Sequence, residues 1–344
     1  MPEPEVMHSD HAGNTLRQIF LGPQGVRAGW RLLIFLALVG VLLTASIPLQ
    51  GLAVRRFGMA FSPPNVIFGE TVTFSIIVIV TLIMGRFECR RLSDYGLPVR
   101  LALGKQFWSG ALWGFAMVSV IVALMASSHA YSVGGLALSP AGVLKFGLLW
   151  GVAFLLVGLF EESAFRGYMQ FTLTTGMGFW PAALLTCLLF AGAHITNGGE
   201  NLVGVSEIVL IALFLCLALR RTGNLWFAIG WHMAFDWGES FFYSTPNSGI
   251  HATGHMLNAQ LGGSKWLSGG SVGPEASVFD LVVTIAGILL LAKVYPEAKY
   301  QVPDPPATPG PAANAEVLPA EFRANSLPSM AGPTARFREP RRKE

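Results

Sequence analysis

Charged residues are scarce in this sequence of 344 residues. Asp, Glu, Lys and Arg together make up 12% of the chain, against roughly 25% in a typical soluble protein. Hydrophobic residues make up 52%, the mean hydropathy is +0.53, and the formal net charge is only +3. This composition excludes an ordinary soluble domain. We therefore predict an integral membrane protein, without a nucleic-acid partner.

Cysteines are also few, and the N-terminal segment does not resemble a cleavable signal peptide. The three cysteines, Cys89, Cys187 and Cys216, lie far apart in the sequence and lack metal-type spacing, which argues against a disulfide framework and a zinc knuckle. Residues 1–27 contain three acidic residues before any arginine and no apolar core, unlike a signal peptide. The first apolar segment is therefore expected to serve as an uncleaved anchor.

Some catalytic signatures are missing as well. The sequence contains no His-Glu-x-x-His, no Gly-x-Gly-Asp and no Gly-x-Ser-Gly. Their absence argues against zincin-type, aspartyl and rhomboid-type catalysis. His251 and His255 have the i,i+4 spacing of metal ligands, but they lie in a Gly-rich loop without a local third ligand, and we interpret them as structural.

Long apolar runs, in contrast, are abundant. A helix needs about 20 residues to span the hydrocarbon core of a bilayer, and eight segments fit that template. We therefore predict an all-α, polytopic membrane helical bundle of about eight transmembrane helices. The candidate segments are 30–53, 65–85, 107–127, 145–171, 180–197, 203–220, 225–243 and 278–295.

The basic residues are unevenly distributed among the loops. With the N-terminus inside, 18 of the 23 Lys and Arg residues fall on one side, including the cluster 86–105 and all eight basic residues after 290. Cytoplasmic loops carry an excess of Lys and Arg. We predict that both termini are cytoplasmic and that the membrane is a bacterial inner membrane.

Three regions follow from these patterns. Residues 1–27 form an N-terminal cytoplasmic segment, and residues 28–299 form the transmembrane domain. Residues 300–344 contain nine prolines and no long apolar run, which predicts a disordered tail. Within the transmembrane domain, residues 244–276 form a long Gly- and Ser-rich loop, which we interpret as a plain connector rather than a mobile flap over a site.

The fourth apolar segment contains Glu161, Glu162 and Arg166 in a setting where charges are costly unless paired or used. On a helix, Glu162 and Arg166 are i,i+4 and share a face, so they can neutralise each other. Glu161 points about 100° away and has no cation within reach on its own helix. An unpaired carboxylate removed from water is suited to a general base that works near neutral pH.

Two later segments supply imidazoles. Phe190 and His194 are i,i+4 on one face of the fifth segment. In the seventh segment, His232, Asp236 and Glu239 stand at i, i+4 and i+7, a polar stripe on an apolar helix. Costly polar groups on three apolar helices indicate convergence on one site. Counting along the predicted helices, however, places Glu161 and His194 in different halves of the bilayer.

The inventory of one carboxylate and two imidazoles is compatible with two chemistries. Glu161 and His194 can activate a water for hydrolysis, with His232 and Asp236 stabilising the oxyanion or holding the second imidazole. The same residue types can also bind a divalent metal through two His and one carboxylate. Residue type alone does not separate these alternatives. Glu70, near the start of the second segment, is expected to pair with another helix or to line an access path.

Taken in order, Glu161-Glu162-x-x-x-Arg166, Phe190-x-x-x-His194 and His232-x-x-x-Asp236 resemble the motifs of the CPBP intramembrane proteases. That family includes CAAX prenyl endopeptidases, bacterial Abi proteins and the lysostaphin resistance protein A group. The resemblance covers about residues 145–245. It implies a helical membrane hydrolase in which Glu161 and His194 activate water while His232 and Asp236 form the oxyanion side.

The resemblance also implies supporting roles. Glu162 and Arg166 would keep the site in shape, and Phe190 would support it. Glu239 is expected to support the site because it shares the helical face of His232. Members of the family have been described both as metalloendopeptidases and as metal-independent glutamic proteases. We favour the second, with no cofactor. In the metal-dependent alternative, zinc would be held by Glu161, His194 and His232.

One position departs from the family pattern, because the best-studied eukaryotic-type members have Asn where this chain has Asp236. An ionised Asp cannot donate a hydrogen bond to an oxyanion, so we expect Asp236 to orient His232. The predicted function is hydrolysis of a peptide bond in a membrane-associated peptide or protein, with a CAAX substrate the less favoured option. The alternatives are an inert membrane scaffold or bacteriocin-immunity-type protein, and a proton-coupled carrier.

Overall fold

Long apolar helices dominate the structure, a computed structural model that describes residues 19–22, 25–58, 60–195 and 202–302. All eight predicted segments contain a helix. The helices are α2 (Ala28–Phe57), α3 (Pro63–Glu88), α4 (Lys105–Ser127), α5 (Pro140–Glu161), α6 (Gln170–Met177), α7 (Phe179–His194), α8 (Leu202–Thr222), α9 (Trp226–Trp237), the short α10 (Lys265–Ser268) and α11 (Val278–Val294). The predicted all-α membrane bundle is confirmed.

Fewer helices are long enough to span a membrane than the eight predicted segments. Among the described residues, five helical stretches are long and apolar enough to cross a bilayer: α2, α3, α4, Pro140–Met177 and α8. Helix α7 is apolar but has only 16 residues, and α9 has 12. The expected eight crossings are therefore not confirmed. The tail beyond residue 302 and residues 1–18 lie outside the described residues.

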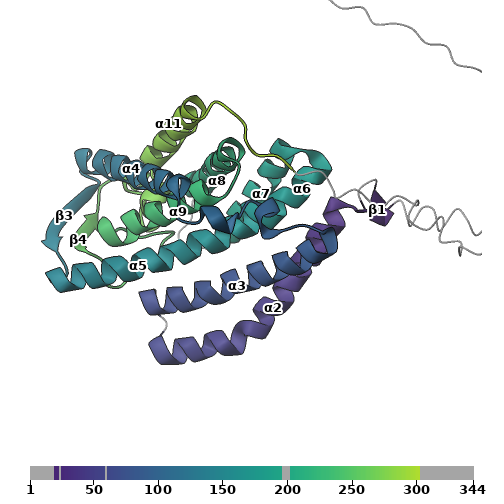
Figure 1. The fold of residues 1–344 in the computed structure, drawn as a ribbon. Coiled ribbons are helices and arrows are strands. Elements are labelled where there is room, and N and C mark those ends of the chain that lie inside the picture. The colour runs from purple at the N-terminus through teal and green to yellow at the C-terminus, as the bar shows by residue number, and fades with distance from the viewer. Residues whose placement is uncertain (1–18, 23–24, 59, 196–201, 303–344) are drawn as a thin grey trace, which may run out of the picture. The chain divides into compact units, whose positions relative to one another are not determined.

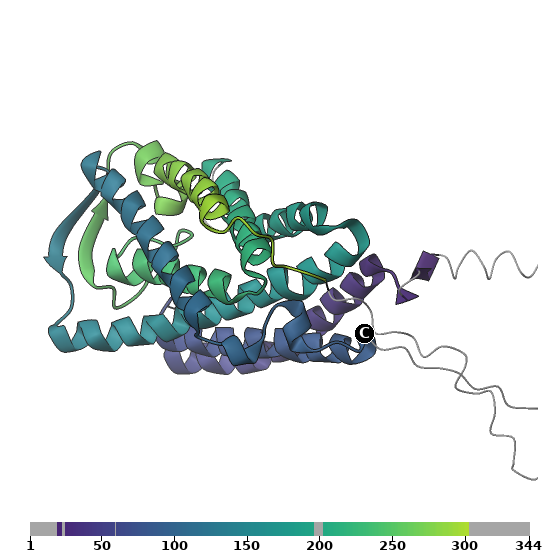
Figure 2. The ribbon, with the colours of Figure 1, turned by 45° about the horizontal axis from the view of Figure 1, so that its top comes forward.

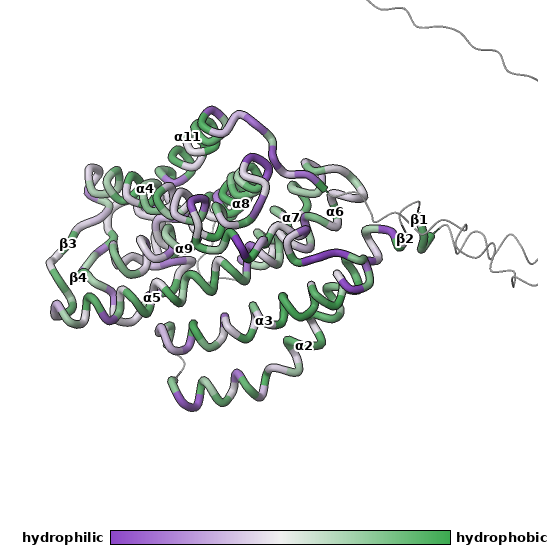
Figure 3. The backbone as a smooth tube through the Cα atoms, in the orientation of Figure 1, coloured by the Kyte–Doolittle hydropathy of each residue, from purple (hydrophilic) through white to green (hydrophobic). Residues whose placement is uncertain are grey.

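Helices α2 and α3 form an outer pair that runs alongside α5 (Figure 1). Large apolar side chains, among them Val41 and Leu52, project outward from α2 and are more than half exposed. The hydropathy-coloured tube shows both helices as largely apolar (Figure 3). Such an extended exposed apolar surface is typical of contact with lipid rather than with water.

Helices α4 and α9 pack with their backbones unusually close. A Cβ atom added at Gly110 would lie 2.0 Å from the carbonyl oxygen of Phe227, and one at Gly230 would lie 2.0 Å from that of Phe107. At Gly114, the corresponding distance to the carbonyl oxygen of Trp231 is 2.2 Å. Only glycine permits this approach, as in the small-xxx-small packing of membrane helices. The packing fixes the position of α9, which carries two of the predicted site residues.

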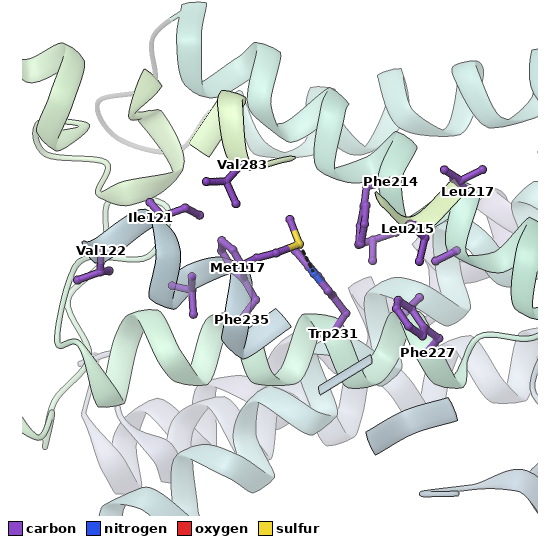
Figure 4. Packing of buried hydrophobic residues seen from close by; sticks show 14 of the residues in the cluster. Met117, Ile121, Val122, Phe214, Leu215, Leu217, Phe227, Trp231, Phe235 and Val283 are labelled. Atoms are coloured by element: carbon purple, nitrogen blue, oxygen red, sulfur yellow. Dashed lines mark hydrogen bonds between the residues drawn. The ribbon is translucent and has the colours of Figure 1, made fainter. Parts of the chain in front are cut away.

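Side chains around the same interface form the largest buried cluster (Figure 4). Trp231 and Phe235 stack with ring centroids 4.7 Å apart, and Phe214 packs on Trp231 from α8. The indole nitrogen of Trp231 also donates a hydrogen bond to the sulfur of Met117 at 3.2 Å. One face of α9 is thereby locked against α4 and α8, which leaves the His232 face for the interior of the bundle.

The predicted helix 145–171 is not one regular helix. Ser139 caps α5, its Oγ accepting a hydrogen bond from the backbone N–H of Gly142, and Pro140 occupies the first turn. After Glu161 the chain forms a π-helical stretch, η3 (Glu162–Met169), before α6 begins. Gly167 within it has φ −79° and ψ −106°, which is not helical. Wider π turns occur frequently at functional sites, because they change the direction in which side chains point.

The interpretation of residues 244–276 as a plain connector is wrong. Within this loop, β4 (Leu257–Leu261) pairs in antiparallel fashion with β3 (Tyr131–Leu136), which lies between α4 and α5 (Figure 2). The hydroxyl of Tyr131 donates a hydrogen bond to the carbonyl of Tyr243 at 2.9 Å. A short helical turn, η5 (Pro274–Ala276), completes the loop. The loop is therefore held against the bundle along its length.

The opposite end of the bundle gathers the basic residues. Arg31 of α2 forms an ion pair with Glu88 of α3, with 2.9 Å between Nη1 and Oε2. The backbone N–H of Lys299, beyond α11, donates to the carbonyl of Arg220 at the end of α8. Further turns in this region are η1 (Leu92–Tyr95) and η2 (Val99–Leu101), with the small hairpin β1 (Leu21–Gly22) and β2 (Gly25–Val26) at the start of the described chain.

Candidate active site

Three helices bring the predicted carboxylate and imidazoles together. Glu161 is the last residue of α5, His194 is the last residue of α7, and His232 lies in the middle of α9. The Oε1 atom of Glu161 lies 4.0 Å from Nε2 of His194, and its Oε2 atom lies 3.5 Å from Nε2 of His232. This 4.0 Å contact contradicts the expected placement of Glu161 and His194 in different halves of the bilayer.

Glu162 faces away from this pair of contacts and is fully buried. Its Oε1 atom lies 3.2 Å from Nη1 of Arg166, as the i,i+4 spacing predicted, and 3.1 Å from Nδ1 of His232. The contact with Arg166 is an intrahelical ion pair, and the contact with His232 is a hydrogen bond between helices. Glu162 thus fixes the orientation of the His232 ring through Nδ1.

Asp236 lies on the other side of the same ring. Its Oδ2 atom is 3.5 Å from Nε2 of His232, which is the nitrogen that also faces Glu161. The shorter contact to the ring is the one made by Glu162. Glu162 and Asp236 contact opposite nitrogens of the ring, so the orientation of His232 by Asp236 stays a prediction. Asp236 shares with Glu161 the side of the ring that faces the site.

Phe190 lies between Arg166 and His194. Its ring lies 4.4 Å from the guanidinium carbon of Arg166 and 4.4 Å, between centroids, from the ring of His194. Phe165 meets it edge-on at 5.1 Å. The Nδ1 atom of His194 lies 2.9 Å from the backbone oxygen of Phe190. If Nδ1 donates in this bond, Nε2 is the ring nitrogen directed at Glu161.

These residues line one cavity of about 190 Å³. Glu161, His194, His232 and Asp236 all contribute to its wall, as does Phe190. The remaining wall is largely apolar and comes from α3, α5, α8 and α9. These apolar lining residues are Phe61, Val66, Phe154, Val157, Ile208, Ile211, Leu215, Trp231 and Phe235. A mostly apolar cavity with a few convergent polar groups is typical of a catalytic site.

Four further lining residues come from the loop after α9: Asn247, Ser248, Ile250 and Glu275. The Oε2 atom of Glu275 accepts hydrogen bonds from the backbone N–H and the hydroxyl of Ser248, at 2.6 and 2.9 Å. Burial raises the pKa of the Glu275 carboxyl above its ordinary value of 4.5, although the Ser248 bonds oppose the shift. No local sequence pattern marks these residues, because contacts between residues distant in sequence, among them the β3–β4 pairing, bring the loop to the site.

Two predicted accessory positions behave differently from each other. Glu70 of α3 lines the cavity. The sequence predicted either a pairing with another helix or a place on an access path. Glu239 is fully buried but is not among the described residues that line the cavity. It lies in a π-helical turn, η4 (Gly238–Phe242), that follows α9. The α-helical stripe of i, i+4 and i+7 positions therefore ends before it reaches Glu239.

A zinc site requires three or four ligands that converge on one point. Glu161, His194 and His232 are chemically suitable zinc ligands. Within the part of the chain that the structure describes, however, no group of three His, Cys, Asp or Glu side chains is arranged to hold an ion. The zinc-dependent alternative stays a hypothesis. Cys187 and Cys216, which are far apart in sequence, have sulfurs 3.8 Å apart and are both free thiols.

Part of the chain matches a known protein family. Residues 143–238 match the family described as type II CAAX prenyl endopeptidase Rce1-like. The matched range begins in α5 and ends directly after α9, so it contains Glu161, His194, His232 and Asp236. A search among curated proteins finds no match to the chain.

Proposed function

We propose that the chain, whose residues 143–238 match the Rce1-like family, is an intramembrane endopeptidase that hydrolyses a peptide bond of a membrane-associated substrate. The Rce1-like family is a peptidase family. The observation that carries the proposal for this chain is the position of the Glu161 carboxylate, between Nε2 of His194 and Nε2 of His232, in the wall of a small cavity.

Glu161 and His194 activate the attacking water. Their 4.0 Å separation is too long for a direct hydrogen bond, and a water molecule can contact both atoms. Glu161 takes a proton from that water as its oxygen attacks the carbonyl carbon of the substrate. When the carbon–nitrogen bond of the tetrahedral intermediate breaks, the same proton passes to the leaving amine. Atoms and charges balance without another reactant.

His232 stabilises the oxyanion of that intermediate. Its Nδ1–H donates to Glu162, so Nε2 can donate only when the ring carries a second proton. The carboxylates of Glu161 and Asp236, each 3.5 Å from Nε2, are partners for such a ring. A charged donor in a water-poor cavity stabilises developing negative charge strongly. Asp236 thus supports His232 as a neighbouring charge, and the Glu162–Arg166 pair holds the ring in place.

The test compares peptide turnover by purified wild-type protein and by Glu161→Gln, using a peptide library in detergent or nanodiscs. Glu161→Gln keeps the shape of the side chain and removes the base, so turnover is expected to fall at least about 100-fold. The matched control is Glu297→Gln, which changes an exposed carboxylate outside the cavity. Equal turnover by wild type and Glu161→Gln contradicts the proposal.

A chelator separates the proposed mechanism from the zinc-dependent alternative. Activity that survives a strong chelator supports the glutamate mechanism without cofactor. Activity that is lost in chelator and restored by zinc assigns Glu161, His194 and His232 to the metal instead. Correct folding without turnover of any library member, in wild type as in Glu161→Gln, favours a non-catalytic scaffold or immunity-type protein.

The location is proposed on charge grounds. Integral membrane location follows from the five apolar helices. Arg31, Arg220 and the chain beyond α11 lie at the same end of the bundle. Since Lys and Arg favour the cytoplasmic side, we place this end and both termini in the cytoplasm of a bacterial cell, with the protein in the inner membrane. Reporter fusions at the two ends test this orientation.

A further inference from the structure

Two buried thiols have no task in the proposed hydrolysis. The Sγ atoms of Cys187 in α7 and Cys216 in α8 lie 3.8 Å apart, and both side chains are fully buried. Both residues are free cysteines. A disulfide bond is about 2 Å long. The two sulfurs are therefore close enough to be joined by a movement of α7 against α8.

A buried cation lies beside this pair of thiols. The guanidinium of Arg166 is 1% exposed, and it interacts more strongly with Cys216 than with Cys187. Its Nη1 atom is paired with Glu162, whereas its Nη2 atom is buried and has no oxygen or nitrogen partner within the described chain. Negative charge on the Cys216 sulfur supplies that partner. A neighbouring cation stabilises a thiolate, which is the reactive form of cysteine. Cys216 is therefore the nucleophilic member of the pair.

The thiol pair adjoins the catalytic candidates. Cys187, Phe190 and His194 occupy positions i, i+3 and i+7 of α7, so they share one helical face. The ring of Phe190 lines the cavity and also lies 4.4 Å from the guanidinium carbon of Arg166. Arg166 in turn neighbours Cys216. A chain of contacts therefore leads from the cavity wall to the thiols.

We propose that Cys187 and Cys216 form a reversible oxidation site, which hydrogen peroxide, a small uncharged oxidant, converts to a disulfide. The Cys216 thiol gives up its proton, and the thiolate attacks one oxygen of the peroxide. The O–O bond breaks, the released hydroxide takes up that proton to become water, and Cys216 becomes a sulfenic acid. The Cys187 sulfur then attacks the Cys216 sulfur, and its thiol proton leaves with the sulfenic hydroxyl as a second water. Two thiols are oxidised and one peroxide is reduced, and a dithiol restores both thiols by exchange.

Disulfide formation is expected to slow peptide hydrolysis, and this consequence rests on the proposed function. Closing the distance between the sulfurs from 3.8 Å to about 2 Å draws α7 towards α8. His194 lies on the same face of α7 as Cys187, so its Nε2 atom shifts relative to Glu161. The bond also removes the thiolate beside Arg166. Displacement of a reacting group by about 1 Å lowers a rate by up to about 100-fold.

The test treats the purified full chain in nanodiscs with hydrogen peroxide and then measures its intact mass and the disulfides in unreduced peptides by mass spectrometry. We expect the loss of two hydrogen atoms per chain and a cross-linked peptide that joins Cys187 to Cys216. Dithiothreitol should restore the original mass. Cys187→Ala is expected to prevent the cross-link, whereas the matched control Cys89→Ala, at the exposed cysteine, leaves it unchanged.

Wild-type protein that is oxidised only at Cys89, or that gains oxygen atoms without a cross-link, overturns the proposal, whether or not the variants fold. Activity is then compared before oxidation, after oxidation and after reduction of the same sample. We expect kcat/KM to fall at least about tenfold on oxidation and to recover with dithiothreitol in wild type and Cys89→Ala, but not to change in Cys187→Ala.

The outcomes separate this proposal from the peptidase assignment. An unchanged kcat/KM in fully cross-linked protein overturns the effect on the active site and leaves the oxidation site and the peptidase assignment standing. A cross-link between Cys187 and Cys216 in protein that cuts no peptide in either state supports the oxidation site and overturns the proposed function alone.

Discussion

The Oε1 atom of Glu162 lies 3.1 Å from Nδ1 of His232 and 3.2 Å from Nη1 of Arg166. One buried oxygen thus joins the end of α5 to the middle of α9 and neutralises a guanidinium that is itself only 1% exposed. Adjacent Glu161 uses its two oxygens on the opposite, cavity side. The two neighbouring carboxylates therefore have separate structural surroundings, and substitution can distinguish them.

Glu162→Gln is expected to destabilise the protein far more than Glu161→Gln. Removal of the Glu162 charge leaves Arg166 buried without its carboxylate, which costs about 3–5 kcal/mol. Glu161 is partly exposed to the cavity and forms no ion pair with a buried arginine. Glu161→Gln should therefore change the free energy of unfolding by no more than ~1 kcal/mol. Reversible unfolding in mixed micelles measures both values.

A double variant provides the control for this comparison. Arg166→Met in the Glu162→Gln background removes the unpaired charge and should recover part of the lost stability. Equal stability of Glu162→Gln and wild type would show that the ion pair does not hold the fold.

Phe190→Leu is expected to lower activity more than stability. Leucine fills part of the volume but presents no ring face to Arg166 and His194. We expect a loss of stability of about 1.5 kcal/mol or less and a roughly tenfold lower kcat/KM, whereas Phe190→Ala should cost about 3–5 kcal/mol. Phe87→Leu, at a position 80% exposed, is the surface control. Full activity of Phe190→Leu would show that the Phe190 ring is not needed to position His194.

Gly114→Ala should disrupt the site, although Gly114 lies on α4 and does not line the cavity. The new methyl group would lie 2.2 Å from the carbonyl oxygen of Trp231, the residue before His232, so α4 and α9 must separate. Overpacking of this kind costs about 1–3 kcal/mol. Gly40→Ala, in α2 with nothing within 4 Å of the new atom, should instead be neutral or stabilise by up to ~1 kcal/mol. Similar unfolding midpoints for the two variants would contradict the close α4–α9 contact.

Glu275 gives the stability of the protein a defined dependence on pH. Its pKa in the folded protein lies above the ordinary 4.5, so the folded state holds this proton more tightly than the unfolded state does. The contribution is fully present below pH 4.5 and is lost as the pH rises through the raised folded value. Glu275→Gln removes this dependence.

The measurement compares unfolding midpoints of wild type and Glu275→Gln between pH 4 and 8. Wild type should lose stability relative to the variant as the pH increases, and the difference should level off once the carboxyl is ionised in both states. A relative gain by wild type with increasing pH would mean that the carboxylate is stabilised, not penalised, in its folded surroundings.

Local patterns predicted the helices and much of the cavity wall. Apolar runs located every long helix, because each must bury or immerse a complete apolar surface. The i,i+4 rule gave the Glu162–Arg166 pair, since both residues lie on one helical stretch. The contact of Glu162 with His232 was not accessible to such rules, because it depends on how α5 crosses α9.

The close packing of α4 on α9 follows from a pattern that is visible in the sequence. Gly110 and Gly114 are separated by four positions in an apolar helix, the spacing that permits close helix contact. It indicates that α4 has a tightly packed partner without saying which helix that partner is. Glu275 had no comparable signal, because a loop residue reaches a site only through contacts distant in sequence.

The pairing of β3 with β4 has a consequence for the order of assembly. Tyr131 and its partner Leu261 are 130 residues apart in sequence. At a synthesis rate of 5–20 residues per second, β4 emerges roughly 6 to 26 s after β3. The catalytic candidates up to Asp236 are all synthesised in that interval, but the wall that contains Ser248 and Glu275 closes only afterwards. A nascent chain therefore inserts its helices before the cavity is complete. The loop wall forms last, when β4 pairs with β3, which was synthesised earlier.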